Sequence, residues 1–305
     1  MRKNKIAISP YLTLAFGIFG LSMTSIFVRW ADAPGTVTAA YRMAFSAIVL
    51  TPFVVRQEIN IEGRKSSLLR MIPLAGLFVA LDHGFLNTAI GMTKIANCTL
   101  LNNIAPIWVA LFALIVWREK MHKWFWVGLS FTLAGAVIIL GSDLILHPQL
   151  GLGDGFAFLS SLFYAGYFLV TQSSRTRISA LQYIWMVNIV SAVLLFAYNM
   201  LMGNPLFGYS PLTWLVFIGA GVFSQTVGYF SVAHALGHLP ASIVSPTMVL
   251  QIVLTALLAI PFAGESLSSN QLIGGLTILA GILIINLTRR QKTVNGRQKP
   301  LTQNL

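Results

Sequence analysis

The sequence predicts an all-α membrane protein whose ten transmembrane helices form two inverted five-helix repeats. Three observations predict this fold class. First, 56% of the 305 residues are hydrophobic and only 9% are charged, whereas soluble domains carry about 25% charged residues. Second, apolar residues form continuous runs of the roughly 20 residues that a membrane helix needs. Third, the basic residues gather on one side of the predicted membrane, and part of the sequence recurs later in the chain.

The apolar runs are continuous and do not alternate as barrel strands do, so we expect helices. The predicted spans cover residues 10–29, 35–55, 71–93, 95–117, 122–141, 153–172, 180–202, 211–233, 240–262 and 268–288. Helix-breaking residues separate them, for example Pro34 with Gly35 and, later, Pro240. Because no segment between spans is long enough to form a domain, we expect the function to reside within the helices. The single Cys98 excludes an internal disulfide and a multi-cysteine metal site.

The first 33 residues also have the pattern of a signal peptide: a basic start, an apolar stretch and a small-residue site at residues 31–33. The apolar stretch, residues 11–28, is longer than such a peptide requires. In addition, Arg29 and Trp30 stand immediately before the supposed cleavage site. We therefore expect the first helix to be retained.

The net charge of +12 would indicate a polyanion partner in a soluble protein, but here topology accounts for it. If the N-terminus is cytoplasmic, 17 of the 20 Lys and Arg residues fall in cytoplasmic segments. Only Arg29 and Lys94 lie on the other side, and Arg42 lies within the second span. By the positive-inside rule, the sequence predicts a multi-pass protein of the cell inner membrane with both termini in the cytoplasm. We expect the protein to contact the lipid bilayer and not to bind nucleic acid.

The recurrence has a constant offset of 146 residues. The matching pairs include two acidic residues and several glycines: Glu119 with Glu265, Gly128 with Gly274, and Gly135 with Gly281. Because each repeat holds an odd number of spans, the two copies insert with opposite orientation. Inverted repeats are typical of secondary transporters that work by alternating access. The predicted units are residues 1–145 and 146–290, followed by a basic cytoplasmic tail, 291–305, expected to be disordered. A membrane scaffold that transports nothing is the alternative.

Several of these residues together resemble the EamA-type permeases of the drug/metabolite transporter superfamily. The resemblance rests on Ala40-Tyr41-Arg42, on the run from Ala96 to Pro106, and on Glu119, Gly128 and Gly135. It covers nearly the whole chain as two five-helix units, and it implies an inner-membrane permease or exporter with a central cavity between the halves. Family members commonly place a Pro thirteen residues before the second Glu, where this chain has Ile252. We therefore expect the bend in the ninth span to be displaced.

Ionisable groups within the bilayer mark the candidate site, because each costs several kcal/mol unless it is paired or hydrated. Arg42 lies in the second span, and Asp82 and His83 lie in the middle of the third. Asp82 is interpreted either as a proton-binding coupling carboxylate or as one half of a fixed ion pair with Arg42. Arg42 has a third interpretation, as a ligand for a carboxylate or phosphate of the substrate. His83 points about 100° away from Asp82 around the helix.

Uncharged polar residues complete the set of candidates for substrate binding or coupling. They are Asn102 in the fourth span, Gln225 and Tyr229 on one face of the eighth, and Gln251 in the ninth. Three further residues are expected to be structural: Pro106 as a helix break, and Glu119 and Glu265 as helix caps. The glycines of the fifth and tenth spans indicate close helix packing, either between two copies or within one chain.

No enzyme motif is present: the chain lacks H-E-x-x-H, G-x-S-x-G and a phosphate-binding glycine loop. An intramembrane enzyme using Asp82 and His83 is the second alternative. We expect no cofactor and no metal. The prediction is a secondary transporter, a permease or exporter of a small metabolite such as an amino acid. It would be driven by a substrate or proton gradient and would act as a monomer or a homodimer.

Overall fold

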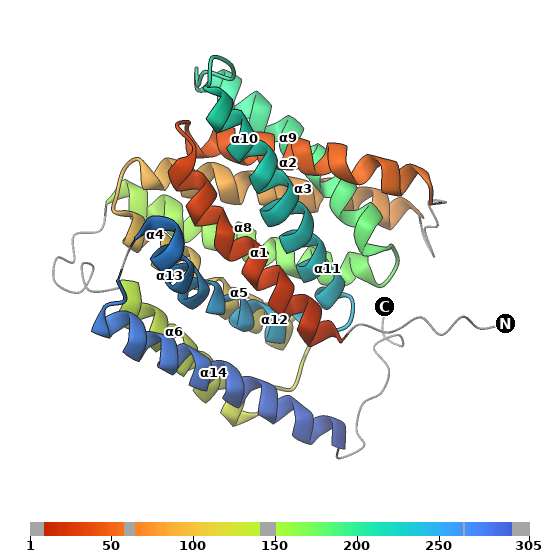
Figure 1. Cartoon of the computed structure of the whole chain (residues 1–305). Helices are drawn as coiled ribbons and strands as arrows, with labels where there is room; N and C mark the ends of the chain where they lie inside the picture. Colours follow the sequence, from red (N-terminus) through yellow and green to blue (C-terminus); the bar gives the residue numbers. More distant parts are fainter. Residues whose placement is uncertain (1–8, 58–64, 141–150, 265, 295–305) are drawn as a thin grey trace.

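The structure, a computed structural model, describes residues 9–57, 65–140, 151–264 and 266–294. These residues are almost entirely helical, and the helices pack together into one bundle (Figure 1). In chain order the first half contains α1 (Pro10–Trp30), α2 (Gly35–Val55), α3 (Lys65–Ile90), α4 (Ile95–Asn102), α5 (Ala105–Ile115) and α6 (Lys123–Leu140). The second half contains α8 (Leu152–Arg175), α9 (Ala180–Leu201), α10 (Pro211–Gly219), the π-helix η1 (Ala220–Tyr229), α11 (Phe230–Leu236), α12 (Ala241–Met248), α13 (Leu250–Ala263) and α14 (Ser269–Val294). Counting α4 with α5, α10 with η1 and α11, and α12 with α13 as single spans, the ten predicted spans are confirmed.

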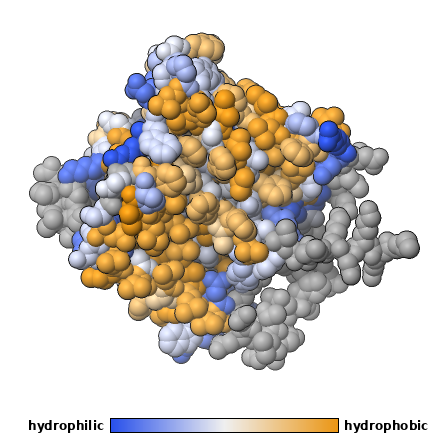
Figure 2. All heavy atoms as spheres, in the orientation of Figure 1, coloured by the Kyte–Doolittle hydropathy of each residue, from blue (hydrophilic) through white to orange (hydrophobic). Residues whose placement is uncertain are grey.

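The outer surface has the apolar character of a membrane protein. Within the described residues, nine segments are long and apolar enough to cross a bilayer. The remaining span, α8, is the sixth in chain order; it has 24 residues but carries more polar side chains. Large apolar side chains are exposed on many helices, and Figure 2 shows them covering most of one face. Since no aqueous surface stabilises such exposure, the chain is a multi-pass membrane protein.

The contact between α6 and α14, which lie side by side along one edge of the molecule (Figure 1), reveals the inverted symmetry. A Cβ on Gly128 would lie 2.7 Å from the carbonyl oxygen of Gly281, and one on Gly135 would lie 2.5 Å from that of Gly274. Gly128 therefore faces the repeat equivalent of Gly135, and Gly135 faces the repeat equivalent of Gly128, as a two-fold axis between the repeats requires. These glycines serve packing within one chain, which decides between the two roles predicted for them.

Spans four and nine are both broken near the middle of the membrane. The first break separates α4 from α5 around Asn103, and Pro106 follows in the first turn of α5. The second break falls at Val249, which is 146 residues after Asn103. The expectation of a displaced bend was wrong. The break keeps its place although Ile252 stands where family members commonly have a Pro, and the proline nearest to it, Pro246, lies before the break inside α12.

Span eight contains the π-helix η1, which the sequence did not predict. Gly76 of α3 packs against Val190 of α9, and Gly221 packs against Phe45 of α2. Gly221 lies 145 residues after Gly76, and Val190 lies 145 residues after Phe45. Beyond η1, the offset between the two repeats is 146 residues. A π-helical turn accommodates one inserted residue in a helix. The insertion in span eight explains both the one-residue change of offset and the local geometry.

Two expectations concerned the C-terminal part of the chain. Helix α14 continues to Val294, beyond residue 291, where the sequence predicted the tail to begin. Glu265, which was predicted to be a helix cap, lies outside the described residues.

Candidate substrate site

The candidate site lies where helices of the two repeats meet in the interior. Arg42 in α2 is 3% exposed, and Asp82 in the middle of α3 is 4% exposed. Helix α3 packs against α8 and α9 of the second repeat, and α2 packs against α9 and η1. These contacts enclose both charged side chains. A buried charge persists only if polar neighbours compensate its lost hydration, so those neighbours define the site.

Arg42 is held by a neutral histidine. Its Nη2 donates a hydrogen bond of 3.0 Å to Nε2 of His83, one residue along α3 from Asp82. As the acceptor, this nitrogen carries no proton, so the ring stands in its neutral form. The Nε of Arg42 is buried without a hydrogen-bond partner. The guanidinium therefore retains an unused donor in the interior.

Asp82 is held by an amide from the break in span four. Asn102, the last residue of α4, donates from Nδ2 to Oδ1 of Asp82 at 3.0 Å and to Oγ of Ser160 at 2.9 Å. Ser160 in turn donates to the carbonyl of Ala157 in α8. The end of α4 thus links a carboxylate of the first repeat to a helix of the second.

The two buried charges are near one another but are not bonded to each other in the described residues. They interact electrostatically, together with the phenol groups of Tyr164 in α8 and Tyr229 in η1. Each finds its hydrogen bond with a neutral partner instead. This arrangement leaves both charges able to interact with a third group, which a closed bidentate ion pair would not.

A second polar cluster lies one turn along α2. Ser46 bonds to Thr226 of η1 at 2.8 Å and accepts a bond of 2.9 Å from Asn188 of α9. Gln225 donates to Oδ1 of Asn188 at 2.8 Å, while its own Oε1 is buried without a partner. The π-helix therefore directs two consecutive polar side chains toward the junction of α2 and α9, next to the charged cluster.

Some predicted site residues lie elsewhere. Gln251 donates to the carbonyl of Leu21 at 3.2 Å, and so it joins α13 to α1 and not to the charged cluster. Both carboxylate oxygens of Glu119 accept hydrogen bonds of 3.1 Å from Ser242 of α12. Its predicted capping role stays a prediction. Sequence reasoning missed Ser160 and Asn188. The signal for Ser160 was the low hydropathy of the sixth span, and the signal for Asn188 was an amide side chain in the middle of the seventh span.

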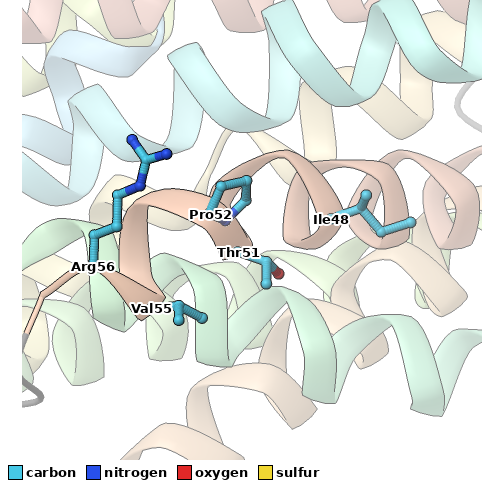
Figure 3. A pocket seen from close by; sticks show the side chains of 5 residues that line it. All are labelled: Ile48, Thr51, Pro52, Val55 and Arg56. Carbon is cyan, nitrogen blue, oxygen red and sulfur yellow. The ribbon is translucent and has the colours of Figure 1, made fainter.

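A surface hollow of about 560 Å³ lies away from these clusters. Figure 3 shows its five lining residues, Ile48, Thr51, Pro52, Val55 and Arg56, all in the second half of α2 or directly after it. Arg42 lies in the first half of that helix. Because the hollow is largely apolar and one helix lines it, it lacks the converging polar groups of a substrate site.

Ten membrane-crossing helices in two inverted halves, with a cation and a carboxylate buried where the halves meet, are the architecture of a membrane transporter. The chain belongs to the EamA-like transporter family, whose model matches residues 8–141 and 151–287. The resemblance seen in the sequence is confirmed.

Relatives agree with this class, and a solved structure shares the fold. An "Uncharacterized transporter" of Archaeoglobus fulgidus is 24% identical over 266 residues, which is 87% of this chain and 91% of that protein. An "Uncharacterized transporter" of Clostridium kluyveri is 25% identical over 256 residues, 81% of each chain. A crystal structure titled only as that of a protein has a TM-score of 0.78 at 17% identity, covering 93% of this chain and 99% of that one. This last likeness concerns the fold alone.

Proposed function

We propose that this transporter is a secondary carrier that exports or exchanges a small polar metabolite, such as an amino acid, by alternating access. One observation carries the proposal: Arg42 and Asp82 are buried close together, yet each is bonded to a neutral side chain. A solute with both a carboxylate and an ammonium group could engage both charges at once. The unpartnered Nε of Arg42 offers a further hydrogen-bond donor to the carboxylate of the solute.

Asp82 is the proposed coupling group. A carboxylate in the interior is stable either when it is protonated or when a cation lies beside it. If substrate binding and protonation of Asp82 exclude each other, then the proton gradient drives solute in the opposite direction. We further propose that the two halves divide near residue 145, that both termini are cytoplasmic, and that the protein lies in the cell inner membrane, as the charge distribution indicates.

The test begins with a ligand screen on detergent-purified protein. A ligand that binds the folded state raises the temperature of unfolding by mass action. We expect at least one amino acid or similar polar metabolite to raise it. The solute that does so is then tested for movement into sealed proteoliposomes under an imposed pH gradient.

The decisive variant is Asp82→Asn, which keeps the shape of the side chain and removes its proton-binding capacity. We expect it to abolish the response to the pH gradient. Its matched control is Asp32→Asn, which alters a carboxylate in the turn between α1 and α2, outside the site. Full gradient-driven uptake by Asp82→Asn would show that Asp82 is not the coupling group. If purified protein moves no solute in sealed vesicles, the carrier function itself is wrong.

A further inference from the structure

The two short helices that begin spans four and nine are equivalent in the repeat but differ in burial. All eight residues of α12 are buried, whereas only three of the eight in α4 are. At their first residues the contrast is greatest: Ala241 is 0% exposed, and Ile95 is 65% exposed. Helix α12 packs against α5 and α8, while α4 lies mainly on α8 and α6. Helix α12 therefore closes one end of the molecule, whereas α4 leaves the opposite end more open.

Polar bonds fasten α12 at this end. The hydroxyl of Ser242 donates to both carboxylate oxygens of Glu119, which follows α5 in the first repeat. The backbone N–H of Ala241 donates to Oε1 of Gln172 in α8. Between α5 and Glu119 the chain turns at Arg118, whose φ of 51° lies in a region that side chains other than Gly rarely adopt. The start of α12 is thus tied to the end of α5 and to α8.

Two of the residues that make these ties have apolar equivalents at the other end. With the offset of 146 beyond η1, the position equivalent to Ser242 is Ala96, and with the offset of 145 before η1, the one equivalent to Gln172 is Phe27. Neither side chain forms hydrogen bonds. The start of α4 is fastened differently, by Thr93, whose hydroxyl donates to Oδ1 of Asp154 in α8 at 3.0 Å. The end that carries the Ser242–Glu119 and Ala241–Gln172 bonds is the cytoplasmic one by the charge distribution.

Behind these ties lie buried hydroxyl groups without partners. Tyr167 OH and Ser174 Oγ, two turns apart on α8, and Ser245 Oγ on α12 have no hydrogen-bond partner. The ring of Tyr167 contacts that of Tyr229, with centroids 5.8 Å apart, and so it borders the charged cluster. Unpartnered buried hydroxyls are rare and call for an explanation, such as water that enters in another conformation.

We propose that Ser242, Glu119 and Gln172 form a latch that closes the cytoplasmic end of the transport pathway, and that Tyr167, Ser174 and Ser245 line that pathway when the latch opens. The proposal rests on the alternating-access carrier proposed above. In the opened state water reaches the unpartnered hydroxyls, and α12 moves away from α5. The burial of all eight residues of α12 favours the conformation in which the latch is closed.

The test measures access of a thiol reagent to single cysteines. In a background of Cys98→Ala, reporters are placed by Ser245→Cys behind the latch and by Thr99→Cys at the equivalent position in α4. The protein is held in lipid nanodiscs, where N-ethylmaleimide reaches both faces, so that the result does not depend on orientation. We expect the Thr99→Cys reporter to react at least about tenfold faster than the Ser245→Cys reporter.

Breaking the latch should reverse this difference. Ser242→Ala should raise the labelling rate of the Ser245→Cys reporter by about tenfold and lower that of Thr99→Cys, because the closed conformation loses bonds to a charged group. Ser242→Thr keeps the hydroxyl and should change neither rate. Glu119→Ala removes the same bonds from the other side and should act as Ser242→Ala does, which covers the case in which one variant fails to fold.

The proposal is overturned if the two reporters react equally fast in the parent, or if both latch variants leave the rates within about twofold. Labelling needs no solute, so a failure of the latch proposal is distinguishable from a failure of the proposed carrier function. Solute movement without an effect of the latch variants would refute the latch alone. Labelling as expected without solute movement in sealed vesicles would refute the carrier function alone.

Discussion

Asn102 joins the two repeats at the candidate site, and Asn102→Leu removes its two hydrogen bonds while keeping the branching of the side chain. The bond to Asp82 is worth about 1.5–3 kcal/mol if the carboxylate is charged. The bond to Ser160 is a neutral interhelical bond, worth about 0.6 kcal/mol in membrane proteins. We therefore expect a loss of about 2–3.5 kcal/mol in the free energy of unfolding. At 1.4 kcal/mol for each factor of ten, the folding equilibrium falls by at least about thirtyfold.

The assay is reversible unfolding of the purified protein by SDS titration of mixed micelles. Asn103→Leu is the matched control, because the side chain of Asn103 bonds only to the carbonyl of Thr99 in its own helix, and it should cost less than about 1 kcal/mol. A double-mutant cycle with Asp82→Asn should give an interaction energy above about 1 kcal/mol. If the two changes are additive within about 0.5 kcal/mol, Asn102 does not act by holding a charged Asp82, and the reasoning is refuted.

Three other predictions follow from individual contacts. Gly135→Ala places a Cβ against the backbone of Gly274 and should lower the free energy of unfolding by about 1–3 kcal/mol, whereas Gly155→Ala, with nothing within 4 Å, should be neutral or slightly stabilising. Arg118→Gly should raise that free energy by up to about 1–2 kcal/mol, since glycine adopts the left-handed backbone without cost; a loss of stability would contradict this. Arg42→Lys keeps the charge but loses the planar guanidinium. The apparent ligand affinity, measured by ligand-induced stabilisation in a thermal-shift assay, should therefore fall at least about tenfold. An unchanged affinity would show that Arg42 is not part of the site.

The sequence predicted the spans and the repeat because both depend on patterns along the chain. Apolar length marked each helix, and Gly128 and Gly274 could be matched because close helix packing leaves few alternatives to glycine at such positions. The π-helix η1 could not be predicted in this way. A one-residue insertion changes neither the apolar content nor the length of span eight appreciably, and it is visible only where Gly221 meets α2.

The sequence predicted which residues belong to the candidate site but not which hydrogen bonds they form. Arg42, Asp82 and His83 could be selected because charged or basic groups are rare within spans. Which of the two α3 side chains faces Arg42 depends on the rotation of α3 against α2, and the structure brings His83 to the guanidinium and Asp82 to Asn102. Ser242 was missed because a serine near a helix start is unremarkable until its partner, distant in sequence, is known.

Counterflow in proteoliposomes tests the central claim most directly. Vesicles are loaded with an unlabelled mixture of amino acids, and the same mixture is supplied outside in trace radiolabelled form. A carrier that alternates between two closed ends returns labelled solute inward for each unlabelled molecule that leaves. We predict transient accumulation of label above the external concentration in loaded vesicles and none in empty ones. Equal entry into loaded and empty vesicles, or no entry beyond that of protein-free liposomes, would contradict alternating access for this class of solute.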